Sequence, residues 1–236
     1  MRLRCFENSR KTKDYGKTKN GHSVLLRLQY GDFGVFFGGD LNKPAEQFLL
    51  HHYTGLSLLP TSGRPYSEAL KMIRERFRSE VMKTCHHGSA DVTEMFIDAV
   101  NPACFISSSG DAEGHVHPRP DLLGKLGKFG RGKAPVLLST ELQRSTREAE
   151  STGTVSALLK LVEDLAQNPT EAAVEEAKRK ILHLGRNNVD VYSAIYLKTD
   201  GKRLITAFKI ETGSEPKKWF YFEYHIGASG ELVVTD

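Results

Sequence analysis

The sequence predicts a mixed α/β domain, followed by a helical hairpin and a β-meander. Up to about residue 140, short apolar runs alternate with segments of helical spacing, which is typical of alternating strands and helices. After residue 190, apolar runs separated by turn residues follow one another, which indicates antiparallel strands. Apolar runs such as VLLRL and GVFFGG are far too short to cross a bilayer, so no membrane segment is expected.

Composition indicates an ordinary soluble protein with one large domain. Hydrophobic residues make up 39% of the 236 residues and charged residues 26%. The net charge is +4, and its densest basic run, at 10–19, is typical of a solvated loop, with a phosphate-facing loop as the alternative. Three cysteines at unrelated spacings argue against a disulfide framework, and the N-terminus has no signal-like apolar stretch. We therefore expect a cytoplasmic location.

The first part of the chain predicts a β-hairpin and then two helices. Residues 23–37 contain two strand-like runs on either side of the turn YGDFG. The second run ends in GGD at 38–40, and Asn42 marks the start of a helix over 46–53. Apolar residues at helical spacing predict the next helix over 67–77.

The middle of the chain continues the alternation of helices and strands. A short helix is expected over 91–100, with Asp91 as its N-cap, and a strand over 103–107. A helix over 120–126 and a strand over 135–140 follow. Together with the N-terminal hairpin, these elements form the first of three expected segments, residues 1–150.

The C-terminal part predicts two further segments. Residues 151–187 form the expected hairpin, with helices over 154–167 and 169–184 and Asn168 as N-cap of the second, laid on the outside of the domain. Residues 188–236 form the expected meander of the same domain. Its predicted strands are 191–197, 203–211 and 219–225.

Ligand-type side chains follow several of these elements. Asp40 ends a strand after two glycines, His86 and His87 lie in KTCHHGS, and His115 and His117 lie in a Gly/Pro loop. Carboxylates and imidazoles are ligands that zinc, manganese and iron accept. Taken alone, a GGD is commonly a turn with a helix cap, and adjacent histidines are commonly surface or core residues. Their occurrence at three junctions favours a metal site.

Cys85 beside His86 offers another interpretation, a thiol nucleophile with its base. On an extended strand, neighbouring side chains point to opposite faces and cannot form the required hydrogen bond. We therefore expect Cys85 to be a buried filler residue, and a cysteine hydrolase ranks below a metal site.

The order of the motifs GD, HHGS and GHVHP resembles the second half of the metallo-β-lactamase-fold hydrolases related to the soluble domain of the competence protein ComEC. The resemblance covers about residues 20–140. It implies a four-layer αββα sandwich, of which this chain has the C-terminal half, with a metal site at one edge. It also implies zinc or manganese as cofactor, as a binuclear centre in a complete site.

The resemblance also implies roles for individual residues. The implied metal ligands are Asp40, His86 and His115, of which Asp40 and His86 are also the catalytic residues, and the implied substrate contacts are His87, Ser89 and His117. Asp40 corresponds to the carboxylate that bridges two metals. The family has proline where this chain has Val116, so His115 and His117 both remain candidates for the last ligand.

One part of the family pattern is absent, the upstream signature H-x-H-x-D-H or H-x-D-x-D-H. Three interpretations are open: an N-terminal half is omitted from the sequence, a partner chain supplies it, or the chain is a non-catalytic remnant. The predicted function is a metal-dependent hydrolase of phosphodiesterase or nuclease type, with a metal-activated hydroxide as nucleophile. The alternative is a binding or structural module.

The expected partners follow from the same interpretation. They are nucleic acid or another phosphodiester, a partner chain or N-terminal half, and a second copy of this chain. Half of a sandwich exposes a sheet face and an unpaired strand edge, which self-associate unless they are covered. We therefore expect a homo-oligomer, and a fully monomeric chain would contradict the half-fold interpretation.

Overall fold

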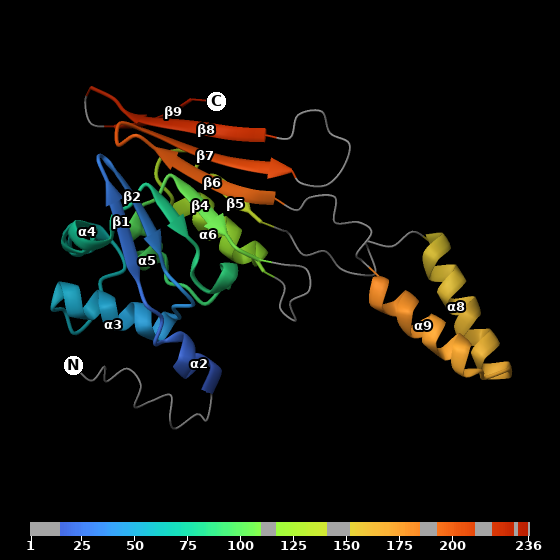
Figure 1. Cartoon of the computed structure of the whole chain (residues 1–236). Coiled ribbons are helices and arrows are strands. Elements are labelled where there is room, and N and C mark those ends of the chain that lie inside the picture. The colour runs from blue at the N-terminus through green and yellow to red at the C-terminus, as the bar shows by residue number, and fades with distance from the viewer. Residues whose placement is uncertain are drawn as a thin grey trace.

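The computed structural model describes residues 15–109, 117–140, 152–184, 193–210, 219–228 and 231–235. The described residues form two stacked β-sheets, with helices over the outer face of the first sheet and a helical hairpin to one side (Figure 1). The predicted mixed α/β class is therefore confirmed. Within the described ranges the helices and the two sheets form three layers, α, β and β, and the predicted C-terminal half of a four-layer sandwich stays a prediction.

The first sheet has five strands in the order β1-β2-β3-β4-β5. Their bounds are β1 (Leu26–Tyr30), β2 (Phe33–Phe37), β3 (Val81–Lys83), β4 (Cys104–Ser107) and β5 (Val136–Ser139). β1 and β2 form the predicted antiparallel hairpin, and β2 to β5 run parallel to one another. Phe37 pairs with Lys83, and Lys83 pairs with Ile106, so β2, β3 and β4 end at the same edge of the sheet.

Four helices cover one face of this sheet (Figure 1). Their bounds are α3 (Lys43–Thr54), α4 (Gly63–Phe77), α5 (Glu94–Val100) and α6 (Pro120–Phe129). Large side chains from the sheet and the helices form one buried core, which includes Phe36, Leu50, Ile73, Met82, Phe96, Phe105 and Leu126. Each such side chain contributes about 1.5–3 kcal/mol by leaving water. This core fixes the helices, and with them the loops that leave the strand ends.

Two helix starts differ from the prediction. α5 is capped by Thr93 rather than Asp91, because the Thr93 hydroxyl accepts the N–H of Phe96 at 3.3 Å. α9 (Glu171–His183) is capped by Thr170 rather than Asn168 in the same way. In both cases the predicted cap lies two residues before the true one, and the chain enters the helix only after the threonine.

The second sheet has four antiparallel strands in the order β6-β7-β8-β9. Their bounds are β6 (Ser193–Thr199), β7 (Arg203–Ile210), β8 (Trp219–Ile226) and β9 (Leu232–Thr235). The prediction missed β9, which is short. Leu204 and Tyr224 of this sheet pack against Val81, Cys104 and Leu138 of the first sheet, so the meander covers the face that the helices leave free.

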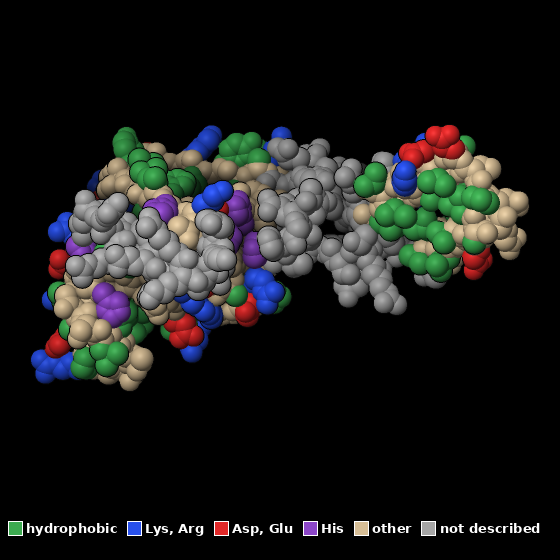
Figure 2. All heavy atoms as spheres, turned by 90° about the horizontal axis from the view of Figure 1, so that it is seen from below, with side chains coloured by type: hydrophobic (Ala, Val, Ile, Leu, Met, Phe, Trp, Pro, Cys, Tyr) green, Lys and Arg blue, Asp and Glu red, His purple; other side chains and the backbone are tan. Residues whose placement is uncertain are grey.

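The helical hairpin consists of α8 (Thr152–Gln167) and α9. Figure 1 shows it standing apart from both sheets, whereas the sequence predicted a hairpin laid on the domain. It carries exposed apolar side chains, which Figure 2 shows gathered on the face seen from below. They include Val155, Leu159, Val162, Val174, Ile181 and Leu182. No helix in the described ranges is both long enough and apolar enough to span a membrane.

Two glycine turns hold the sheets together at one end. Gly31, in the β1–β2 turn, has a positive φ of 57° and lies against Gly201, in the β6–β7 turn. The N–H of Asp32 donates to the carbonyl oxygen of Gly201 at 3.0 Å. A Cβ on Gly31 would lie 2.3 Å from that oxygen, so only glycine allows this approach.

We expect Gly31→Ala to destabilise the protein more than Gly55→Ala. Gly55 also has a positive φ, 68°, but open space surrounds the position of its Cβ. In both variants, alanine in a left-handed conformation adds backbone strain of about 1–2 kcal/mol. Gly31→Ala also adds a steric cost of about 1–3 kcal/mol. Urea unfolding of the two variants measures the difference. Equal losses would show that the turns do not lock the sheets.

Candidate functional site

The candidate site lies at the edge of the first sheet where β2, β3 and β4 end. β2 leads into Gly38, Gly39 and Asp40, and β3 leads through Thr84 into the turn η2 (Cys85–Gly88). β4 leads into the serine-rich segment at 107–109. Because parallel strands present their C-terminal ends at one edge, these three segments meet there.

The η2 turn replaces the extended backbone expected for HHGS. His86 has φ 47° and ψ 51°, and His87 has φ 55° and ψ 14°, so both lie in the left-handed region. This conformation is uncommon for residues with a side chain. The premise that Cys85 and His86 occupy opposite faces of a strand is therefore wrong, and Cys85 has to be judged from its surroundings.

The Gly-Gly segment holds one side of the η2 turn. The N–H of His86 donates to the carbonyl oxygen of Gly39 at 2.9 Å. A Cβ on Gly38 would lie 2.3 Å from the sulfur of Cys85, so a glycine is needed for the two segments to pack. The glycines before Asp40 thus position the histidines as well as the aspartate.

The His-Pro segment holds the other side of the turn. The N–H of Arg119 donates to the carbonyl oxygen of Gly88 at 2.9 Å. A Cβ on Gly88 would lie 2.6 Å from the Cβ of Pro118. The peptide bond between His117 and Pro118 is cis. Close packing therefore brings His117 to the histidine turn although the two are about thirty residues apart in sequence.

Asp40 and His87 face one another across the site. The N–H of Asp40 donates to the hydroxyl of Ser23 at 2.8 Å, and its Oδ1 lies 3.6 Å from Nε2 of His87. Nδ1 of His87 lies 2.6 Å from the carbonyl oxygen of Ser108, so Nδ1 carries a proton and donates it. In the neutral ring, the lone pair of Nε2 therefore faces the carboxylate. Both side chains are more than a third exposed and are open to a ligand.

His86 and His117 form a second pair. Their ring centroids are 5.8 Å apart. The side-chain amide of Asn20, at the end of α2 (Tyr15–Asn20), donates to Nε2 of His86 at 3.3 Å. The neutral ring then carries its proton on Nδ1, which is buried without a hydrogen-bond partner among the described residues. Such an unpaired group costs about 1–3 kcal/mol, so Nδ1 of His86 is a place where a further partner would fit.

Two other predicted residues stand apart from these pairs. The hydroxyl of Ser89 accepts the N–H of Asp91 at 3.2 Å, so it is engaged in its own loop. Its role as a substrate contact stays a prediction. His115 lies outside the described residues.

The side chains of these two pairs are of types that bind metals, but too few of them lie together to form a metal site. Catalytic zinc normally takes three protein ligands and a water. Within the ranges that the structure describes, no group of three or more His, Cys, Asp or Glu side chains could hold a metal ion. The described residues therefore do not complete a metal centre by themselves.

Cys85 is unsuited to nucleophilic catalysis. It is 5% exposed, and burial raises the pKa of its thiol well above the usual value, with the nearby charge of Glu46 acting in the same direction. A thiol that stays protonated is a weak nucleophile. The expectation that Cys85 is a buried filler residue is confirmed.

The sequence prediction missed Glu46, a buried carboxyl group in α3. It is fully buried, and its Oε2 accepts the N–H of Thr93 at 2.5 Å, which ties α3 to the start of α5. Burial raises the pKa of Glu46 to about 8, and the charge of Asp91 adds to the effect. Its spacing of four from Leu50 places it on the side of α3 that faces the core, which is a partial signal in the sequence, but its burial comes from contact with the start of α5.

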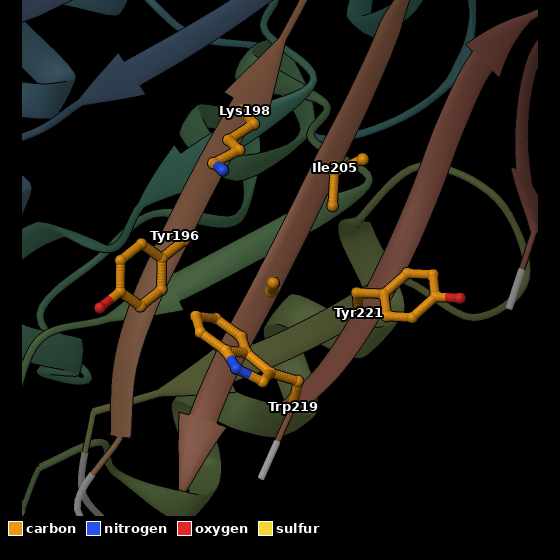
Figure 3. A pocket seen from close by; sticks show the side chains of 6 residues that line it. Tyr196, Lys198, Ile205, Trp219 and Tyr221 are labelled. Carbon is orange, nitrogen blue, oxygen red and sulfur yellow. The ribbon is translucent and has the colours of Figure 1, made fainter. Parts of the chain in front are cut away.

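A second candidate site is an aromatic groove on the outer face of the second sheet (Figure 3). Tyr196, Ala207 and Tyr221 lie in one row across β6, β7 and β8. Because Ala207 has only a methyl group, the rings on either side stand above it and leave a groove of about 550 Å³. The ring of Trp219 lies 5.0 Å from that of Tyr196, and Lys198 lines the same groove.

The comparisons with known proteins give one partial relationship. "Competence protein ComA" from Neisseria gonorrhoeae is 28% identical in an alignment of 148 residues that covers 56% of this chain and 18% of that protein. The chain thus spans less than a fifth of that relative's length. No protein-family model and no solved structure matches. A relationship to a competence protein is therefore supported, whereas the metallo-β-lactamase fold and the hydrolase activity stay predictions.

Glu46→Gln should change how stability depends on pH. The folded pKa of Glu46, about 8, lies above its ordinary value of 4.5, so its contribution to stability is complete below pH 4.5 and is lost as the pH rises through 8. Glutamine carries no charge at any pH. From pH 5 to pH 8, the variant should therefore gain about 2–4 kcal/mol of unfolding free energy relative to the native chain.

Urea unfolding at several pH values measures this gain. Glu68→Gln is the matched control, because Glu68 is an exposed residue of α4. A difference between Glu46→Gln and the native chain that does not vary with pH would contradict the raised pKa.

Proposed function

We propose that this chain contributes part of the active site of a metal-dependent hydrolase of the metallo-β-lactamase superfamily that cleaves phosphodiesters. The observation that carries the proposal is the approach of Asp40 and His87, at 3.6 Å, from the ends of two parallel strands. The partial match to a competence protein and the order of the GD, HHGS and GHVHP motifs add support. The remaining ligands would come from outside the described residues.

The chemistry of the described residues is consistent with this role. A complete site would hold zinc or manganese, in a binuclear centre, and would supply a metal-activated hydroxide. Asp40 offers a carboxylate and His87 offers the lone pair of Nε2, whereas the buried Nδ1 of His86 carries a proton, so His86 would bind a metal through this nitrogen only in the other tautomer. His115, in the GHVHP motif, remains the proposed further ligand of this chain.

A positive charge beside the site favours an anionic substrate. The ammonium group of Lys83 donates to the carbonyl oxygen of Gly39 at 3.4 Å, next to Asp40. A cation in this position would attract a phosphodiester and would offset its charge as it approaches the carboxylate. The mild net charge of +4 acts in the same direction.

Metal analysis of the full chain tests the proposal. After dialysis against zinc and then against metal-free buffer, the native chain should keep close to stoichiometric zinc, and Asp40→Asn should lose most of it. Asp32→Asn is the control, because Asp32 is a partly exposed carboxylate in the distant β1–β2 turn. Hydrolysis of bis-p-nitrophenyl phosphate should fall at least about 100-fold in Asp40→Asn alone.

Either of two results would count against the hydrolase proposal. One is a native chain with less than about a tenth of an equivalent of zinc, since the proposed centre depends on bound metal. The other is equal zinc in the native chain and in Asp40→Asn. Both would favour a binding module.

A binding function has its own supporting observation, the aromatic groove. Tyr196, Trp219 and Tyr221 are 40%, 44% and 55% exposed. Exposed rings on a sheet stack with nucleobases, and nearby lysines bind the phosphates. Lys198 lines the groove, and the ammonium group of Lys209 lies 6.0 Å from the centre of the Trp219 ring. The second candidate function is therefore binding of single-stranded nucleic acid.

Fluorescence tests this second function directly, because Trp219 is the single tryptophan of the chain. Adding single-stranded oligothymidylate in the presence of EDTA should quench its emission. Ala207→Leu fills the groove and should weaken binding at least about tenfold, since stacking contributes about 1–3 kcal/mol per base. Ala134→Leu, at an exposed loop position, is the control. Unchanged emission, or equal binding by Ala207→Leu, would exclude the groove.

A further inference from the structure

β1 is an open strand edge. Among the described residues no strand pairs with its outer side, and all five of its residues are exposed. Leu26, Leu28 and Tyr30 alternate along it and are 60%, 61% and 58% exposed. These three side chains lie on the same side of the first sheet as their pairing partners in β2, which is the side toward the second sheet. The second sheet does not cover these three side chains. β1 therefore offers both an unpaired backbone and an apolar stripe.

The register shows which backbone groups reach this edge. The carbonyl oxygen of Gly34 accepts the N–H of Glu80, so the peptide groups of Gly34 point away from β1 and toward β3. Directions alternate along a strand, so Val35 points toward β1 and toward its partner Leu28. Leu28 is thus bonded to β2, and its neighbours Arg27 and Gln29 direct their N–H and C=O groups to the open edge.

The edge lacks the usual protection against pairing. Natural edge strands carry lysine, proline or a bulge. β1 pairs with β2 without a bulge, and its sequence, LRLQY, has neither lysine nor proline. Its one charged side chain, Arg27, is held by hydrogen bonds within the same chain: it donates to the carbonyl oxygen of Arg78 at 2.8 Å and to the side chain of Gln29 at 2.6 Å. Nothing in β1 opposes the approach of another strand.

We propose that β1 pairs in antiparallel fashion with β1 of a second copy, about a two-fold axis at Leu28. This register uses all five strand residues. It places Leu28 opposite Leu28 of the second copy, Leu26 opposite Tyr30, and Arg27 opposite Gln29. Apolar side chains then meet apolar ones, and each arginine meets an amide. An axis at Arg27 would instead set two like charges directly opposite each other, which is unfavourable.

The sequence of β1 thus favours its own copy as the partner. Arg27 and Gln29 of each chain exchange hydrogen bonds with Gln29 and Arg27 of the other, which pairs every edge group of these residues. The two five-stranded sheets become one continuous sheet, and the apolar stripes extend one another. This association requires neither metal nor substrate, so it stands apart from the proposed function.

Cysteine cross-linking tests the register. Leu28→Cys is made in a Cys5→Ser background, in which the remaining native cysteines, Cys85 and Cys104, are buried. Across a non-hydrogen-bonded antiparallel pair the Cα atoms are about 4.5 Å apart, which a disulfide can span. Mild oxidation should therefore link most of the Leu28→Cys chains as dimers.

Arg27→Cys is the matched control for this register. Its two copies lie opposite Gln29 rather than each other, at more than the roughly 7 Å that a disulfide allows. It should form little dimer. Cross-linking of both variants to the same extent, or of neither, would overturn the proposed pairing.

Light scattering tests the association itself. The native chain should have twice its 26.3 kDa mass at micromolar concentration. Leu28→Lys puts two lysines opposite each other and should weaken the dimer at least tenfold, while the monomer stays folded, with a native circular dichroism spectrum, because the position is 61% exposed. Leu58→Lys, at an 83% exposed loop position, should remain dimeric. A native chain of monomer mass, or a Leu28→Lys dimer as tight as the native one, would overturn the proposal.

Discussion

The candidate site depends on the parallel register of β2, β3 and β4. Phe37, Lys83 and Ile106 pair in one row, so the chain leaves three neighbouring strands at the same level. Asp40, the η2 turn and the 107–109 segment begin from that level and meet within a few residues. β3 has only three residues, and a shift of one position would reverse the sides that its side chains face. The buried core on both faces of the sheet, with Met82 on one and Val81 on the other, holds this register.

The histidine turn shows how tight packing replaces favourable local conformation. Left-handed backbone at His86 and His87 costs about 1–2 kcal/mol per residue and persists only where the surroundings enforce it. Here Gly38 admits the sulfur of Cys85, the Gly39 carbonyl accepts the His86 N–H, and Pro118 closes against Gly88. The glycines of two motifs thus act together, since each removes a Cβ that would separate the segments. The backbone is fixed, while the side chains of Asp40 and His87 remain open to solvent.

Most strands and helices were predictable from sequence because periodicity and turn residues are local signals. The β1–β2 hairpin, α3 to α6 and three strands of the meander follow from such patterns. Three features depend on contacts between distant segments and were missed. The left-handed turn at His86 is imposed by Gly39 and Pro118, the burial of Glu46 arises from α5, and the meander's place over the first sheet arises from Leu204 and Tyr224. The pairing of Asp40 with His87 was predictable as a meeting of strand ends, but its distance was not.

The described part of the chain combines a well-packed core with several surfaces that are suited to bind a further ligand or partner. The side chains between the helices and the first sheet are almost fully buried, so these surfaces do not result from loose packing. These surfaces are the two pairs of side chains of metal-binding type, the open edge of β1, the aromatic face of the second sheet and the apolar side of the helical hairpin. Water-exposed apolar groups and unpaired strand edges favour association, because covering them gains hydrophobic free energy and hydrogen bonds. The proposed hydrolase site, the nucleic-acid groove and the β1 dimer each use a different one of these surfaces. An experiment that contradicts one of these proposals therefore leaves the other two unaffected.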